Sequence, residues 1–187
     1  MLTVKRVTEQ SELVDIQHLQ SENLRKNLLP EEAVAQGFLM AEYSLDFLQT
    51  MHAAAPSIIA KDGDTLAGYA LVALPSIRYE HELLADLFNN IDKALYQEQH
   101  IKNSKYVVVG QLCVAKKYRG QGLVQNMYEH FRECLSSDYK YCITDIAHAN
   151  ARSLAAHIRT GFQIIDTSSY GGVEWHIVLW DWNKSLY

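Results

Sequence analysis

The sequence predicts a mixed α/β fold in which helices pack on a partly antiparallel sheet. A chain of 187 residues, of which 48% are hydrophobic and 21% charged, is large and apolar enough to bury a core of its own. Amphipathic stripes at helical spacing alternate along the chain with short apolar runs that are typical of strands. One pair of runs is joined by tight-turn residues, as in a hairpin. We therefore expect one domain spanning residues 1–187.

Each element of the N-terminal third has a local signal. Alternating apolar residues indicate a strand, and apolar residues three to four apart indicate a helix. Proline followed by acids favours a helix start, serine favours an N-cap, and Asp-Gly between apolar runs favours a tight turn. In order, these signals predict a strand over 2–8, helical spacing over 13–28, a helix start at Pro30, a helix over 45–55 capped by Ser44, and a hairpin joining 57–60 to 66–74.

The remaining two thirds of the chain alternate between helices and strands. The apolar stripes over 81–99 and 123–135 are the strongest helical signals. Gly110 interrupts the apolar strand predicted over 106–114, which indicates a bulge or a close backbone approach. The other expected elements are a strand over 141–147, a helix that follows Asn150, carries the stripe Ala151, Leu154, Ala155 and Ile158 and ends at Gly161, and closing strands over 162–166 and 173–182.

Charge, hydropathy and cysteine content exclude several function classes. Lys plus Arg number 17 and Asp plus Glu number 22, and this net charge of −5 argues against a nucleic-acid or anionic-membrane surface. No apolar run is long enough to span a bilayer, and no signal-peptide pattern stands at the N-terminus. The three cysteines form no C-x-x-C pair and indicate free thiols, so we expect a cytoplasmic protein. None of the eight histidines has metal-site spacing, so we expect no metal.

The segment 111–124 joins a buried strand to the strongest helix through a turn with two glycines. Backbone N–H groups at a helix N-terminus bind anions, and Gly120 and Gly122 allow a phosphate to come close because they lack Cβ atoms. The adjacent cations are Lys116, Lys117 and Arg119. The turn therefore predicts a phosphate or pyrophosphate site, with a connection that binds nothing as the alternative. The dinucleotide fingerprint is not met, because Gln125 stands at its third glycine.

The run Arg119-Gly120-Gln121-Gly122-Leu123-Val124 resembles the pyrophosphate loop of the GCN5-related N-acetyltransferase (GNAT) family, whose pattern is R/Q-x-x-G-x-G/A. Val124 departs from the pattern at its last position. The resemblance extends to the apolar strand before the loop, to Asn150 before a helix that ends in Gly161-Phe162, and to the hairpin. It covers roughly residues 57–75 and 105–180.

The resemblance implies a mixed sheet of about seven strands with a splayed parallel pair, in which residues 80–104 are a helical insertion. It also implies that acetyl-CoA binds as co-substrate, with its pantetheine arm satisfying the unpaired backbone groups of a splayed strand. The implied binding residues are Leu112, Cys113 and Val114 on the strand, Arg119, Gly120, Gln121, Gly122, Leu123, Val124 and Gln125 at the loop, and Asn150.

The implied reaction is direct acetyl transfer to an amine of a small molecule or peptide. His157 stands where the family often has a tyrosine that protonates the leaving thiolate, and its ordinary pKa of ~6.5 suits that task. A structural role on the helix face stays open for His157. The amine must lose a proton before it attacks, but the strand 106–114 carries no acid and the sequence names no base. A non-catalytic CoA-binding module is therefore the alternative function.

Three further features have two interpretations each. Cys113 lies beside the implied thioester site, but without a neighbouring base it is expected to be a core cysteine rather than a nucleophile. Phe38, Met40 and Tyr43 fall where the family builds its acceptor site, and they also fit ordinary core packing. The C-terminal aromatic residues Trp175, Trp180 and Trp182 fit either a homodimer interface or the core.

Overall fold

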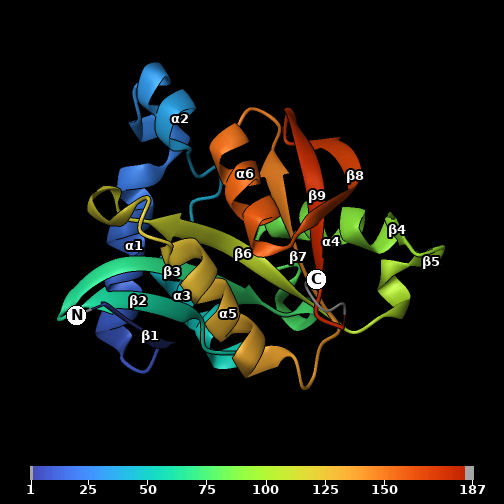
Figure 1. Ribbon diagram of the computed structural model, residues 1–187, viewed down its shortest axis with the longest axis horizontal. Helices are drawn as coiled ribbons and strands as arrows, with labels where there is room; N and C mark the ends of the chain where they lie inside the picture. Colours follow the sequence, from blue (N-terminus) through green and yellow to red (C-terminus); the bar gives the residue numbers. More distant parts are fainter. Residues whose placement is uncertain (1, 184–187) are drawn as a thin grey trace.

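A computed structural model describes residues 2–183 and places a seven-stranded sheet between two layers of helices (Figure 1). The strand order is β1-β2-β3-β6-β7-β9-β8, and every neighbouring pair is antiparallel except β6 and β7. This mixed sheet confirms the predicted fold class. Its strands are β1 (Leu2–Arg6), β2 (Ile58–Asp62), β3 (Thr65–Ala73), β6 (Tyr106–Val114), β7 (Tyr141–Ala147), β8 (Gln163–Tyr170) and β9 (Val173–Asp181).

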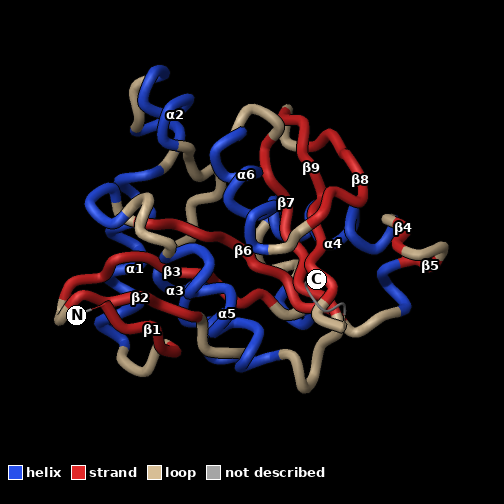
Figure 2. The backbone as a smooth tube through the Cα atoms, in the orientation of Figure 1, coloured by secondary structure: helices blue, strands red, loops and turns tan. Residues whose placement is uncertain are grey.

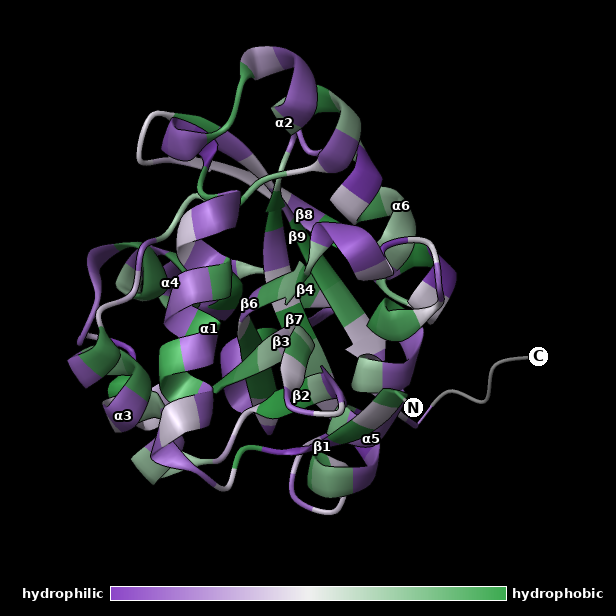
Figure 3. Cartoon of the chain, turned by 90° about the vertical axis from the view of Figure 1, so that its left-hand side faces the viewer, coloured by the Kyte–Doolittle hydropathy of each residue, from purple (hydrophilic) through white to green (hydrophobic). Residues whose placement is uncertain are grey.

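Helices cover both faces of the sheet because its central strands are apolar on both sides. On β2, for example, Ile59 packs in one core cluster, whereas Ile58 and Ala60 pack in the other. The first cluster includes residues of α1 (Gln10–Asn23), α3 (Leu45–Ala54) and α4 (Glu82–Lys93), and the second is built on α5 (Leu123–Leu135). Figure 3 shows the apolar strands at the centre and mixed apolar and polar faces on the helices. The other helices are α2 (Pro30–Gln36) and α6 (Ala151–Thr160).

The parallel strands β6 and β7 separate after a short paired segment. Tyr106 to Val108 pair with Tyr141 to Ile143, and among the described residues no backbone pair joins the two strands beyond that point. The Thr144 hydroxyl donates to the Val109 carbonyl oxygen at 2.7 Å where the strands part. Figure 2 shows the ends of β6 and β7 running in different directions. The divergence confirms the expected splayed pair and leaves backbone groups on the inner edge of β6 in need of partners.

Gly110 is the bulged residue of β6, as the sequence predicts. Val109 pairs with Val72 and Gln111 with Leu71, so Gly110 has no opposite residue on β3. A Cβ at Gly110 would lie 3.1 Å from the Met51 side chain, so glycine suits the crowded side of the bulge. The Tyr43 hydroxyl donates to the Gly110 carbonyl oxygen at 3.1 Å. The bulge thus fixes β6 just where it leaves β7.

Several predicted boundaries differ from the structure. The helical spacing expected over 13–28 belongs to α1, which begins at Gln10 and ends at Asn23. The helix expected over 81–99 ends at Lys93, and the rest forms a short hairpin of β4 (Leu95–Tyr96) and β5 (Gln99–His100). Gln97 and Glu98 at its tip both have positive φ, and no Gly or Asn marks that turn in the sequence. The strand expected over 162–166 continues to Tyr170, because its polar second half is an edge strand paired with β9. No helix within residues 2–183 has the length and hydropathy needed to cross a membrane.

Candidate functional site

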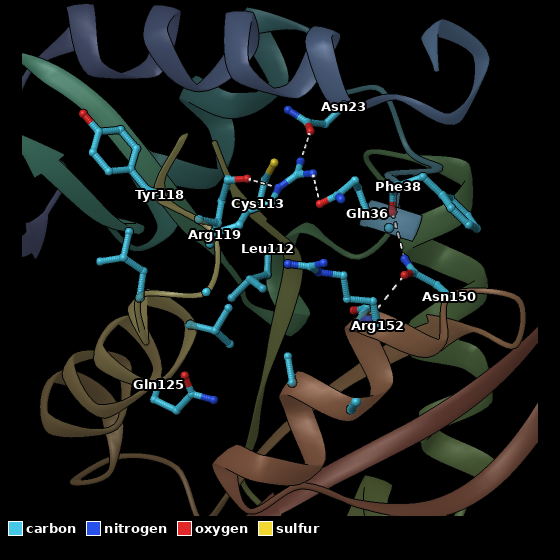
Figure 4. A pocket seen from close by; sticks show the side chains of 18 of the residues that line it. Asn23, Gln36, Phe38, Leu112, Cys113, Tyr118, Arg119, Gln125, Asn150 and Arg152 are labelled. Carbon is cyan, nitrogen blue, oxygen red and sulfur yellow. Dashed lines mark hydrogen bonds between the residues drawn. The ribbon is translucent and has the colours of Figure 1, made fainter. Parts of the chain in front are cut away.

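A cavity of about 680 Å³ lies where β6 has left β7, between the N-terminus of α5, one face of α6 and the segment that follows α2 (Figure 4). Its lining includes every residue that the sequence predicts for acetyl-CoA binding except Gln121. The Gln121 side chain folds back and donates to the Lys117 carbonyl oxygen at 3.1 Å. The role predicted for Gln121 uses its backbone N–H, which that side-chain bond leaves unchanged.

The N-terminus of α5 opens onto the cavity without a side-chain cap. Its N-cap residue is Gly122, with φ 76°, and no side chain accepts a hydrogen bond from the first turn. The first N–H groups of a helix lack intrahelical acceptors, and the helix dipole makes that end positive. A Cβ built on Gly122 or Gly120 meets nothing within 4 Å, so there is open space over this turn. The turn can therefore accept an anion against its backbone.

Arg119 lies in the cavity wall and is held by neutral oxygens. Its guanidinium donates to the Val114 carbonyl at 3.0 Å, to the side chain of Gln36 at 3.3 Å and to that of Asn23 at 2.5 Å (Figure 4). No carboxylate among the described residues forms an ion pair with it, so its positive charge is not neutralised. Asn23 and Gln36 lie more than 80 positions before Arg119 in the chain, so no local sequence pattern links them to it.

Helix α6 contributes two cations that the sequence analysis also missed. Arg152 and Arg159 line the cavity on either side of Ala155 and Ala156, which makes a face of small residues between two guanidinium groups. The stripe predicted for the core included Ile158, but this side chain is 46% exposed. The helix turns its small residues toward the cavity instead. The spacing Arg-x-x-Ala-Ala-x-x-Arg was the available signal.

The two predicted lysines lie away from this wall. Lys116 forms an exposed ion pair with Glu32 of α2 at 2.8 Å, and the Lys117 ammonium lies over the ring of Tyr118. Among the described residues that line the cavity there are three arginines and no carboxylate. The cavity therefore attracts anions, and arginine is suited to phosphate groups because its planar fork of N–H donors matches their oxygens.

Asn150 connects α6 to the segment that follows α2. Its side-chain oxygen caps α6 by accepting from the Ser153 N–H at 3.4 Å, and its amide nitrogen donates to the Phe38 carbonyl at 3.0 Å. A Cβ at Gly37 would lie 2.9 Å from the Asn150 oxygen, and Gly37 has φ 81°, so both space and backbone require glycine there. Asn150 thus fixes the segment that follows α2 to the N-terminus of α6, and both line the cavity.

Cys113 and His157 are both buried. Burial raises the pKa of the Cys113 thiol to about 12, so the thiol is protonated near neutral pH. His157 is 3% exposed; its Nδ1 contacts the Ser153 carbonyl at 2.8 Å and its Nε2 contacts the Tyr128 hydroxyl at 2.6 Å. A carbonyl only accepts, so Nδ1 carries the proton and Tyr128 donates to Nε2. Burial lowers the pKa of His157 to about 4, so the ring is neutral.

A second, smaller cavity of about 90 Å³ adjoins the first. The two share lining residues on both sides of the gap between the strands, including Leu112 and Asn150. Phe38, Met40 and Tyr43 line this second cavity, where the sequence placed an acceptor pocket. Trp175 also lines this cavity, Trp180 is buried in the core, and Trp182 packs partly buried against the same cluster as Trp180. Within residues 2–183 no group of three or more His, Cys, Asp or Glu side chains is arranged to hold a metal ion.

Comparison with known proteins identifies the same architecture. The family model described as acetyltransferase (GNAT) family matches residues 16–162. The ribosomal-protein-S18-alanine N-acetyltransferase of Escherichia coli superposes with a TM-score of 0.65 at 13% identity, covering 100% of this chain and 99% of that one. A putative acetyltransferase of Salmonella typhimurium, solved with acetyl-CoA, gives 0.63 at 12% identity, with coverage of 100% and 96%.

A GNAT-family acetyltransferase of Streptococcus agalactiae gives a TM-score of 0.67 at 16% identity and covers 98% of this chain and 96% of that one. At such identities the likeness concerns the fold. No curated protein matches the sequence closely.

Proposed function

Because the chain belongs to the acetyltransferase (GNAT) family, we propose that it transfers an acetyl group directly from acetyl-CoA to an amine. The observation that carries this proposal is the large cavity at the splayed strands. It combines three arginines, no carboxylate among its described lining residues, an uncapped helix N-terminus and the free edge of a strand. A long ligand with phosphates at one end and amide groups along its arm fits that set of partners.

We assign the phosphates to the helix end of the cavity and the arm to the strand. The backbone N–H groups at Gln121 to Gln125 hold the pyrophosphate with help from Arg119, and the backbone of Leu112 to Val114 pairs with the pantetheine amides. Asn150 is the proposed partner of the arm on the α6 side. Bound acetyl-CoA supplies an activated thioester, and direct transfer is favoured because the buried Cys113 thiol is protonated near neutral pH.

We further propose that residues 1–187 form one acyltransferase domain in which 80–104 is an insertion. This segment contains α4 and the hairpin of β4 and β5 between β3 and β6. Leu87 of α4 lines the second cavity, so the inserted helix contributes to the acceptor side. The matches of similar folds along nearly the whole chain support a single unit.

Acetyl-CoA is expected to stabilise the protein and to be consumed only when an amine is present. At 100 times its dissociation constant, a ligand that binds only the folded state adds ~2.7 kcal/mol, which corresponds to a rise in Tm of roughly 5–11 °C for a chain of this size. Differential scanning fluorimetry measures the shift, and a thiol reagent measures CoA release with a panel of amines. A shift without thiol release would favour the non-catalytic module, and no shift would contradict both proposals.

The role of His157 can be separated from that of its partner Tyr128. The geometry favours a structural role over proton donation, because both ring nitrogens are occupied and the ring is neutral. We expect His157→Phe to lose ~1–3 kcal/mol of stability, since it leaves the buried Tyr128 hydroxyl without a partner. The double variant with Tyr128→Phe should regain much of that loss, and thiol release should change less than tenfold in both. A loss of turnover above 100-fold with unchanged Tm would instead assign proton donation to His157.

A further inference from the structure

Asp145 is the one acid in the apolar strand β7, and it lies just beyond the point where β6 and β7 part. The last pair between the strands joins Val108 to Ile143, and Asp145 is two residues further along β7. Alternation along the strand places its side chain on the same face as Ile143, which packs in the cluster with α1, α3 and α4. Asp145 lines the second cavity and does not line the first cavity, to which the phosphates are assigned.

The charges along the two adjoining cavities are separated. Among the described residues that line either of them, Asp145 is the only carboxylate, and all three arginines line the larger cavity alone. The lining of the second cavity is mixed: Leu83 and Leu87 from α4, Met40 and Trp175 supply apolar side chains, and Gln111, Thr144, Ser153 and His157 supply polar ones. One end of this continuous space therefore suits an anion, and the other suits a cation, with Leu83, Leu87, Met40 and Trp175 available to contact an apolar stem.

The Asp145 carboxylate has no partner that would neutralise it. No side chain of the described residues forms a hydrogen bond or an ion pair with it, and no lysine or arginine lines its cavity. The titratable side chains that share the cavity are Tyr43 from the loop before α3, His157 from α6 and Tyr170 from β8. Burial raises the pKa of Asp145 to about 7, so near neutral pH this group can both release and accept a proton.

The Tyr170 hydroxyl has no hydrogen-bond partner among the described residues, but a neutral phenol donates a proton rather than taking one. Three other groups that could compete with Asp145 are already engaged. Gln111 accepts from the Tyr69 hydroxyl at 2.7 Å and donates to the Ala41 carbonyl at 2.7 Å, and an amide is not a base. The Tyr43 hydroxyl donates to Gly110, and burial raises its pKa further above the usual range. His157 is fixed by two hydrogen bonds. Asp145 is therefore the group in this cavity that is free to take a proton.

We propose that Asp145 binds the ammonium group of the acceptor and accepts its proton, and that the acceptor is a primary amine on an apolar stem. This inference rests on the proposed acetyl transfer. A cavity of about 90 Å³ is small, so it takes the amine and the first atoms of the stem. The rest of the acceptor lies outside it.

The ammonium gives one proton to Asp145, and the nitrogen lone pair forms a bond to the thioester carbonyl carbon. The C–S bond breaks, and its electron pair leaves with the CoA sulfur. The second nitrogen proton passes to that thiolate, which yields the amide and CoA thiol. Asp145 then releases its proton to water and is ready for the next turnover.

The test uses acetyl-CoA and phenethylamine as the probe amine, with kcat/KM measured between pH 5.5 and 9.5. In the wild-type protein kcat/KM should rise tenfold per pH unit and level off near pH 7, where Asp145 is ionised. Asp145→Asn should lower kcat/KM at pH 7 by ~10²–10⁴-fold. Its profile should lose the break near pH 7 and rise up to the pKa of the free amine, because only unprotonated amine then reacts.

Two controls separate this inference from the proposed function. Asp166→Asn removes an exposed carboxylate on β8 and should leave the profile unchanged. The Tm shift caused by acetyl-CoA should be the same in Asp145→Asn as in the wild-type protein. A wild-type protein without that shift would contradict the CoA site itself. A retained shift with an unaltered pH break in Asp145→Asn would overturn the role of Asp145, and turnover of hydrophilic amines but not phenethylamine would overturn the apolar stem.

Discussion

Gly122→Glu should abolish acetyl-CoA binding, with a loss of affinity of ~1000-fold. The new carboxylate would extend from the first turn of α5 into the space proposed for the pyrophosphate. At a separation of ~4 Å two unit charges repel by about 4 kcal/mol at an effective dielectric constant of 20, which is close to three decades in affinity. The variant is expected to fold, because a Cβ at this position meets nothing within 4 Å.

Backbone strain is the competing explanation for any effect of Gly122→Glu. Gly122 has φ 76°, and an ordinary residue in that region costs roughly 1–2 kcal/mol. Gly172→Glu is the matched control, because Gly172 has φ 72°, also lacks neighbours within 4 Å of its Cβ, and lies in the turn between β8 and β9. Titration calorimetry with acetyl-CoA should show normal affinity in the control. Binding by Gly122→Glu within tenfold of the wild-type affinity would refute the assignment of the pyrophosphate to this turn.

Local sequence signals predicted the parts of the fold that local energetics determines. The stripe of α5, the Asp-Gly hairpin and the bulge at Gly110 each depend on neighbours within a few residues, and the structure has all three. The hairpin with Gln97 and Glu98 at its tip was not predicted, because both residues have positive φ although neither is a glycine or an asparagine, the residue types that usually mark such a turn. Tertiary contacts decide it instead, since Tyr96 in this hairpin bonds Asp181 of β9.

The residues of the site also divide into those with a local sequence signal and those placed by tertiary contacts. The loop from Arg119 to Gln125 was found because one short segment carries its whole signal. Asn23 and Gln36 support Arg119 from distant parts of the chain, so their role becomes visible only in three dimensions. Asp145 did have a signal, as a lone acid inside an apolar strand, but the family resemblance points to an acid on the strand before the loop, and β7 lies after it.

Asp145→Asn should stabilise the protein above pH 7 and have little effect near pH 4. The pKa of Asp145 is raised to about 7 in the folded chain, whereas an unfolded aspartate titrates near ~3.9. Below pH ~3.9 Asp145 is protonated in both the folded and the unfolded chain, so its titration does not change the free energy of unfolding. As pH rises from about 4 to about 7, the unfolded state loses its proton first, so the wild-type protein loses up to about 4 kcal/mol.

Asparagine has nearly the same shape and does not titrate, so it avoids that loss. The difference in Tm between Asp145→Asn and the wild-type protein should therefore grow between pH 4 and 7 and then stay constant, reaching at most roughly 8–16 °C. Thermal melts across this range measure it without any substrate, and Asp166→Asn on exposed β8 is the control, with a flat difference expected. A difference that does not change with pH would mean that Asp145 has an ordinary pKa. If Asp145→Asn gains stability and loses turnover, the Asp145 carboxylate lowers the stability of the fold and is needed for the reaction. Groups that serve catalysis often have this combination of effects.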